Sequence, residues 1–221
     1  MRTLWHCLNS RSFRPLWMLE ELGLDYDLKI LPFPPRVFHK PYFEENPLGT
    51  VPLYVEDGTR MTESAAICQF LADRHADKGL SVGVADPAYG AYLNALHHGE
   101  ATLTFPQTLV LRYRLFEPDE RKQPQVADDY AKWFLARLKL IAALLGQADF
   151  LAANRFTAAD ISVGYALMLA HTIGLDAEFP APVRDYWSRL AGREGLGRAL
   201  RRQDSEAAAQ GGGPSFAVRT P

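Results

Sequence analysis

The sequence has few cysteines and lacks the common cysteine motifs. Only Cys7 and Cys68 occur, far apart and outside any Cys-x-x-Cys pair. This argues against a disulfide scaffold and a zinc site, so no metal is expected, and it fits a reducing compartment. Neither His-Glu-x-x-His nor Gly-x-Gly-x-x-Gly is present, which disfavours a zinc protease and a nucleotide cofactor.

Long apolar runs and a strong charge of one sign are also missing. No stretch approaches the roughly 18 apolar residues that a membrane span requires, and the first residues, MRTLWHCLNSRSFRP, lack the apolar run of a signal peptide. The formal net charge is −2, so neither nucleic acid nor a membrane is favoured as a partner. What is present is an ordinary globular composition, with 48% hydrophobic and 23% charged residues. We expect a soluble, cytoplasmic protein.

Residues 1–78 show alternating strand and helix patterns, which predict an α/β domain. Strands are predicted at residues 2–8, 26–31, 51–55 and 60–62, the last two joined by a hairpin at Asp57-Gly58. Helices are predicted at residues 12–22, 41–45 and 63–75. A βαβ unit followed by a helix, a hairpin and a final helix (βαβαββα) is the order of thioredoxin-type domains.

Beyond a short linker at residues 79–86, only helical patterns follow, so residues 87–203 are predicted to form an all-helical domain. Its first helix starts near Asp86-Pro87 and runs to about Leu115, with a bend near Pro106. Further helices are predicted at residues 126–145, 157–174 and 182–192. Residues 204–221 contain a glycine run and few large apolar residues, and are expected to be flexible or to drape over the surface.

Three segments resemble the glutathione S-transferase superfamily in order and spacing. Residues 10–23 (SRSFRPLWMLEELG) are similar to the active-site loop and first helix of serine-type members. Residues 46–53 (NPLGTVPL), followed by 62–67 (TESAAI), resemble the glutathione-binding block, and 156–161 (FTAADI) resemble the capping motif of the core helix. The resemblance implies an N-terminal thioredoxin-like domain followed by a C-terminal α-helical bundle that carries the pocket for a second substrate.

The resemblance also implies residues that bind glutathione. Val51 pairs its backbone with the cysteinyl part of the peptide, and the bond to Pro52 is cis; the alternative is a trans proline that starts an edge strand. Ser64 and the first amides of its helix suit the γ-glutamyl carboxylate, and Glu63 suits the ammonium group. Capping of that helix is the alternative role for Glu63 and Ser64, and both roles are compatible.

Two further positions carry positive charge. His39 and Lys40 lie about where related classes place a pair that binds the glycyl carboxylate, although the spacing to Pro52 is shorter here. Solvated loop charges are the alternative. Arg14 either adds positive charge near the thiolate or is a solvated helix residue.

The catalytic side chain of serine-type members lies between the first strand and the first helix, where it donates a hydrogen bond to the glutathione sulfur. Asn9 or Ser10 occupies that position, and Ser12 is the third candidate, although we expect it to cap the helix instead. A free thiol has a pKa near 8.5 and is only a few per cent thiolate at pH 7, so such a donor activates it. Cys7 is expected to be buried and inert.

Thr157 and Asp160 have the spacing of a capping box at the start of a helix. Their predicted role is structural, and replacing Asp160 by alanine is expected to cost about 0.5–2 kcal/mol of stability.

The resemblance implies a homodimeric glutathione transferase that activates its co-substrate glutathione as the thiolate and adds it to a small electrophile, as in detoxification. One alternative is glutathione-dependent isomerase, peroxidase, lyase or thiol reductase chemistry on the same fold. The other is a non-catalytic interaction module.

Overall fold

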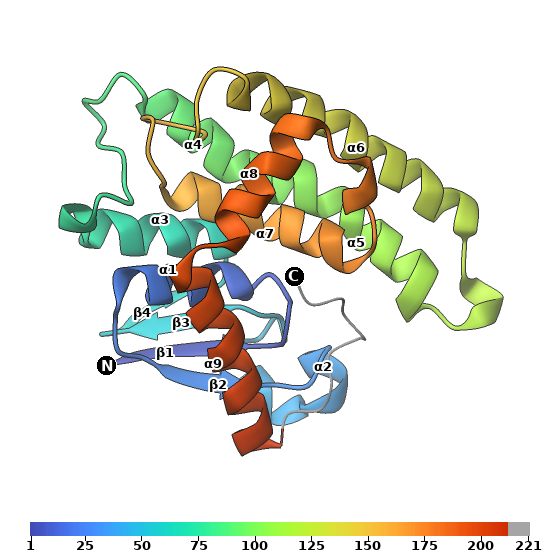
Figure 1. The fold of residues 1–221 in the computed structure, drawn as a ribbon. Coiled ribbons are helices and arrows are strands. Elements are labelled where there is room, and N and C mark those ends of the chain that lie inside the picture. Colours follow the sequence, from blue (N-terminus) through green and yellow to red (C-terminus); the bar gives the residue numbers. More distant parts are fainter. Residues whose placement is uncertain (212–221) are drawn as a thin grey trace. The chain divides into compact units, whose positions relative to one another are not determined.

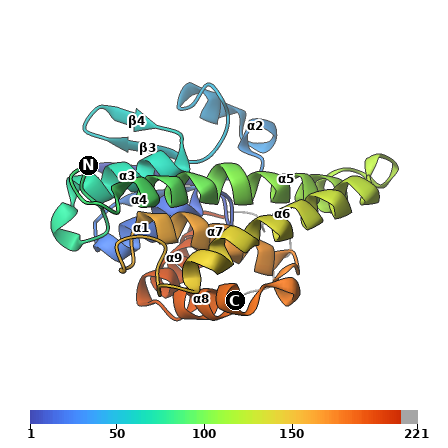
Figure 2. The same cartoon turned by 90° about the horizontal axis from the view of Figure 1, so that it is seen from above.

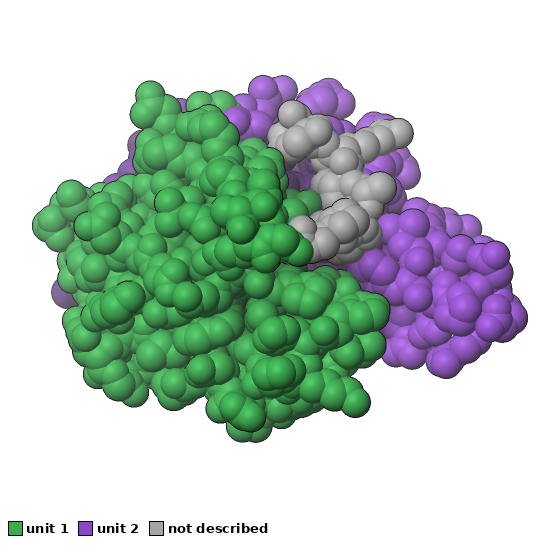
Figure 3. Space-filling model, turned by 90° about the horizontal axis from the view of Figure 1, so that it is seen from below, with its two compact units in different colours: residues 1–81, 192–218 green, residues 82–191, 219–221 purple. Residues whose placement is uncertain are grey.

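A computed structural model describes residues 1–211 of the chain (Figure 1). The described chain divides into two compact units, which Figure 3 colours separately. Unit 1 contains residues 1–81 and 192–211, and unit 2 contains residues 82–191. Residues 212–221 of the predicted flexible tail lie outside the described residues.

Unit 1 is built on a four-stranded sheet in the order β2-β1-β3-β4. The strands are β1 (Arg2–His6), β2 (Asp27–Ile30), β3 (Leu53–Glu56) and β4 (Thr59–Met61). β1 pairs with β2 in parallel, and β3 pairs antiparallel with both β1 and β4. The predicted thioredoxin-like sheet with its Asp57-Gly58 hairpin is therefore confirmed.

The helices of unit 1 are α1 (Phe13–Leu22), α2 (Pro35–Phe38), α3 (Ser64–Arg74) and α9 (Glu194–Gln210). Gly23 ends α1 in the left-handed conformation, with φ of 66°, as its position after the apolar repeat predicts. The helix predicted at residues 41–45 is a 3₁₀ turn at Lys40–Glu44. The short helix α2 inside the proline-rich loop has no counterpart in the prediction, because a proline cluster favours a loop.

The helix α9 corrects the predicted domain boundary. The sequence predicts a helical domain up to residue 203 and a flexible tail from residue 204, and both predictions are wrong for residues 194–210. This segment is a helix that packs against α1 and β2 of unit 1 (Figure 1). Arg193 holds its start to α1, because Nε and Nη2 donate to the two carboxylate oxygens of Glu21 at 2.8 and 2.9 Å.

The inner face of α9 explains the error. Its buried residues are Gly195, Leu196, Ala199, Gln203 and Ala207. Only one of them is a large apolar residue, so the helical repeat carries little hydrophobic signal. A face of small residues and one glutamine is recognisable only once its partner surface is known.

The regular elements of unit 2 are all helices, as predicted. Its α-helices are α4 (Tyr89–His97), α5 (Phe105–Leu111), α6 (Pro124–Leu145), α7 (Ala158–Thr172) and α8 (Ala181–Ala191). The wider π-helical segments His98–Thr104 and Arg112–Phe116 follow α4 and α5 without a break. Pro106 lies in the first turn of α5, where a missing backbone donor is tolerated. The predicted bend near Pro106 stays a prediction.

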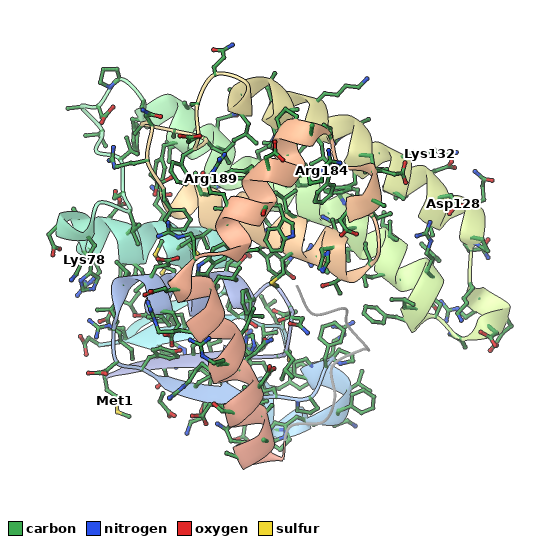
Figure 4. All side chains as sticks on the ribbon, viewed as in Figure 1. Met1, Lys78, Asp128, Lys132, Arg184 and Arg189 are labelled. Atoms are coloured by element: carbon green, nitrogen blue, oxygen red, sulfur yellow. The ribbon has the colours of Figure 1, made fainter. Side chains whose placement is uncertain are left out.

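Helix α7, whose residues 158–170 are all buried, packs against α4, the π-helical segment His98–Thr104 and α8. α5 and α6 run side by side (Figure 2). The charged residues Asp128 and Lys132 of α6, and Arg184 and Arg189 of α8, are exposed; Figure 4 labels them. None of the described helices is long and apolar enough to cross a membrane.

Candidate active site

The loop between β1 and α1 carries the three predicted catalytic candidates. Asn9 lies in the left-handed region with φ of 57°, which asparagine tolerates better than most residues. The amide of Ser10 donates to the carbonyl of Cys7 at 3.2 Å, and the amide of Phe13 donates to the carbonyl of Ser10 at 2.8 Å. Two backbone bonds thus fix the tight turn that presents the half-buried Ser10.

Ser12 occupies the N-cap position of α1, but its side chain does not cap the helix, so that prediction is wrong. Its Oγ lies 2.7 Å from the Oγ of Ser10 and 2.7 Å from Nδ1 of His6, and accepts from the amide of Cys7 at 3.2 Å. The hydroxyl is fully buried. Partners other than the helix amides therefore determine its orientation.

His6 and Gln203 complete this hydrogen-bond network. Nε2 of the fully buried His6 lies 3.1 Å from Oε1 of Gln203. The same oxygen accepts from the amide of Asn9 at 3.2 Å, and Nε2 of Gln203 donates to Oδ1 of Asn9 at 2.9 Å. Burial lowers the pKa of His6 to about 4, against which its bonds to Gln203 and Ser12 act. His6 is therefore neutral at physiological pH.

The loop before β3 is held by Asn46, the first residue of the predicted glutathione-binding block. Its Nδ2 donates to the carbonyl of Thr50 at 2.8 Å, and its Oδ1 accepts from the amide of Leu48 at 3.1 Å. Gly49 has φ of 60°, and an added Cβ would lie 2.8 Å from both Arg36 and Phe43, so only glycine fits. This turn leads directly into Val51-Pro52, whose peptide bond is cis as predicted.

The start of α3 brings three predicted residues together. Glu63 is the exposed N-cap, and Ser64 is the first helical residue, with its side chain buried. Nη1 of Arg14, from α1, donates to the Ser64 Oγ at 3.3 Å. Arg14 is fully buried, which excludes the solvated alternative. A guanidinium and a helix N-terminus thus meet at one hydroxyl, an arrangement that favours an anion.

His39 and Lys40 are both exposed; His39 follows α2, and Lys40 begins the 3₁₀ turn Lys40–Glu44. No hydrogen bond of the described chain joins their side chains to the loop residues or to Ser64. Their assignment to the glycyl carboxylate stays a prediction.

Two residues of the network, His6 and Gln203, are absent from the sequence-based site. The sequence contained a weak indication of a buried His6. It lies two positions after Leu4 on β1, so both side chains point to the same, buried face of the sheet. For Gln203 the sequence contained no such indication, since this residue lies 194 positions from Asn9, on a helix that the sequence does not predict.

In unit 2, the predicted capping box of α7 is confirmed. Oδ2 of Asp160 accepts from the amide of Thr157 at 2.8 Å, and the Thr157 Oγ1 accepts from the amide of Ala159 at 3.3 Å. Asp160 also accepts from the amide of Leu151 at 3.1 Å and from the hydroxyl of Tyr186 at 2.7 Å. Its surroundings are those of a structural carboxylate.

Unit 1 is thus a thioredoxin-like domain with a cis-proline before β3 and polar side chains gathered after β1 and at the start of α3. The family model described as "Glutathione S-transferase, N-terminal domain" matches residues 10–74. The chain is 30% identical over 162 residues to glutathione S-transferase GstA of Escherichia coli O157:H7, covering 72% of this chain and 76% of that protein. The chain belongs to the glutathione S-transferase family.

Other similarities agree. Glutathione S-transferase 3 of Schizosaccharomyces pombe is 40% identical over 75 residues, which cover 34% of this chain and only 31% of that protein. A sphingomonad glutathione S-transferase solved with glutathione has a TM-score of 0.78 at 22% identity, covering 91% of this chain and 98% of that one. The bacterial glutathione transferase BphK, solved as a ternary complex, has a TM-score of 0.79 at 23% identity, covering 91% and 99%. At these identities the solved structures show the fold.

Proposed function

We propose that the protein is a glutathione transferase that binds glutathione in unit 1 and adds its thiolate to a small electrophile. Membership of the family supports this, as do the names of GstA and of the sphingomonad enzyme, which was solved with glutathione. The observation that carries the proposal is the meeting of Arg14 and the α3 N-terminus at Ser64. Family membership alone does not determine the reaction.

The recognition half of the site follows from the chemistry of a peptide ligand. The γ-glutamyl carboxylate binds the Ser64 hydroxyl and the first amides of α3, while Arg14 supplies positive charge from behind. The exposed Glu63 binds the ammonium group. The backbone of Val51, before the buried Pro52, pairs with the cysteinyl part, and His39 and Lys40 take the glycyl carboxylate.

The chemical half of the site lies in the loop that follows β1. Asn9 and Ser10 are the candidates that contact the sulfur, and Ser12 acts behind Ser10. Each unit by which the pKa of the bound thiol falls corresponds to about 1.4 kcal/mol of thiolate stabilisation. Holding the thiolate beside an electrophile supplies proximity, and its lowered pKa supplies the nucleophile.

The geometry of Cys7 disfavours a thiol reductase with its own cysteine. Its side chain is fully buried, and burial raises the pKa of the thiol to about 12. A reactive cysteine needs the opposite, a lowered pKa and access to substrate. The nucleophile is therefore the thiol of glutathione.

By the same resemblance, we propose that the enzyme is a cytoplasmic homodimer with a detoxifying role. The helical unit would supply the pocket for the electrophile. Sedimentation or light scattering of the purified protein tests the dimer directly.

Titration calorimetry with glutathione tests the binding site. We expect the wild type to bind and Ser64→Ala to bind roughly 10- to 100-fold more weakly, because it loses a hydrogen bond to a charged group. Ser188→Ala, the same change at an exposed position of α8, is the matched control and should bind like the wild type. Absence of wild-type binding at millimolar glutathione would reject the proposed function.

A further inference from the structure

Gln203 is the buried polar residue on the inner face of α9. It is 2% exposed, although glutamine is mostly a surface residue, and a buried amide needs hydrogen-bond partners. It finds them at the other end of the chain, because its side chain bonds with Asn9 and His6, 194 and 197 positions away. Gln203 therefore joins α9 to the loop that carries the candidate sulfur ligands.

The amide of Gln203 binds both the backbone and the side chain of Asn9. The Asn9 N–H can only donate, so the atom that it meets at 3.2 Å is Oε1 of Gln203. Nε2 of Gln203 is then the donor, and it meets Oδ1 of Asn9 at 2.9 Å. The Asn9 side chain is thus held by its oxygen, and its nitrogen, the donor atom of that amide, is directed away from Gln203.

The backbone of Asn9 requires such support. Asn9 is the third residue of the turn at residues 7–10, which the amide of Ser10 closes by donating to the carbonyl of Cys7 at 3.2 Å. Its φ of 57° lies in the left-handed region, which residues other than glycine adopt at a cost and keep where their surroundings hold them. Because Ser10 follows directly, the same backbone angle also determines where the Ser10 hydroxyl lies.

We propose that Gln203 is a positioning residue for activation of the glutathione thiol. By holding Asn9 in its left-handed conformation, it keeps both candidate ligands, Asn9 and Ser10, in place to donate a hydrogen bond to the sulfur. The role rests on the proposed function, and it is the same whichever of the two residues contacts the sulfur. Without Gln203 the turn relaxes, the donor is no longer held at the sulfur, and the thiolate loses stabilisation.

A second glutamine on α9 separates anchoring of the helix from positioning of the loop. Gln210 lies about two helical turns after Gln203. Its Oε1 accepts from the amide of Ile30 at 2.9 Å, and its Nε2 donates to the carbonyl of Leu28 at 2.7 Å. Both glutamines thus fix α9 to unit 1, one at the loop after β1 and the other at β2. Gln210→Met loosens the helix without removing a bond to the loop, so it is the matched control.

The test is a pH titration of the ultraviolet thiolate absorbance of glutathione bound to the full-length protein. Gln203→Met keeps the length of the side chain and removes its hydrogen bonds. We expect it to raise the pKa of the bound thiol, so that the ratio of thiolate to thiol at pH 7 falls roughly three- to tenfold, the equivalent of one ordinary hydrogen bond. Affinity for S-methylglutathione, which has no thiol proton, should stay close to that of the wild type. Gln210→Met should lower stability and leave the thiol pKa unchanged.

A double variant tests whether Gln203 acts through Asn9. Glycine adopts the left-handed conformation without support, so in an Asn9→Gly background Gln203→Met should shift the thiol pKa less. An equal shift there would assign the effect to the bond with His6 and overturn the proposal. Gln203→Asn, whose amide is too short to reach Asn9, replaces Gln203→Met if the latter does not fold, and the same rise is expected.

The remaining outcomes separate this proposal from the proposed function. An unchanged thiol pKa in the folded Gln203 variants, or an equal rise in Gln210→Met, overturns the role of Gln203 while glutathione binding by the wild type stands. Absence of wild-type glutathione binding rejects the proposed function and the role of Gln203 with it.

Discussion

Two buried polar networks, one in each unit, differ in how their hydrogen bonds are arranged. In unit 2, the backbone amides of Leu151 and Thr157 and the hydroxyls of Thr157 and Tyr186 all donate to Asp160. In unit 1, the bonds form a chain from Ser10 through Ser12 to His6 and Gln203. The first network converges on one acceptor, and the second ends at a half-buried hydroxyl.

The difference separates a structural network from one suited to function. Four donors around a carboxylate allow only one arrangement of hydrogen bonds, and that arrangement stabilises the start of α7. In a chain of hydroxyl groups the hydrogen bonds can run in either direction, because each hydroxyl can donate or accept, and the residue at the buried end of the chain favours one of them. A residue with a hydroxyl side chain occupies the N-cap of both helices, yet the Thr157 hydroxyl caps α7 while the Ser12 hydroxyl is turned toward His6.

The largest expected effect is on stability in unit 2. Asp160→Ala leaves four donors without their acceptor, so we expect a loss of about 3–5 kcal/mol in the free energy of unfolding, measured in urea. This exceeds the loss expected from the capping box alone, because Leu151 and Tyr186 also bind the carboxylate. A loss below about 1 kcal/mol would show that the convergent network adds little beyond a helix cap.

The next effect belongs to unit 1 and depends on pH. His6 has a pKa of about 4 when folded and 6.5 in its ordinary state, so the unfolded chain binds the proton more readily. Its contribution to stability is complete above about pH 6.5 and is lost as the pH falls toward 4, by about 3 kcal/mol. Asp160 does not share this behaviour, because burial raises its pKa.

Urea unfolding between pH 7 and pH 4 measures that dependence. His98, whose pKa is also lowered, contributes to the slope in the wild type. The difference between the wild type and His6→Asn isolates the contribution of His6, and the variant should have the shallower slope. Equal slopes would mean that His6 is not held neutral by burial.

The sequence predicted the two networks to different extents, for a physical reason. Thr157 and Asp160 are three residues apart, so the capping box is local and its spacing is visible in the sequence. The network of His6 joins positions as far apart as 197 residues, and Gln203 lies on a helix with a weak apolar repeat. The thioredoxin-like sheet was predictable because its strands and hairpin are local patterns, whereas the partner of α9 is a tertiary property.

A smaller effect tests the comparison of the two helix starts. Thr157→Ala removes one capping hydroxyl and should cost about 1 kcal/mol of unfolding free energy, and Thr157→Ser should keep most of it. At Ser12 the same replacement does not remove a capping bond, since none is formed. Amide hydrogen exchange should therefore show faster opening of the first turn of α7 in Thr157→Ala, and no matching change in α1 in Ser12→Ala. Equal fraying of both helices would contradict the difference between them.

The smallest expected effect is on thiol chemistry beside the unit 1 network. The amide of Cys7 donates to Ser12, but its thiol is directed to the carbonyl of Pro32 at 3.7 Å and is buried. Burial raises the pKa of Cys7 and of Cys68 to about 12, so neither forms a thiolate at neutral pH. We expect no measurable alkylation of the native protein at pH 7, and labelling of both thiols once urea unfolds it. Rapid labelling of Cys7 in the native state would mean that the loop after β1 opens.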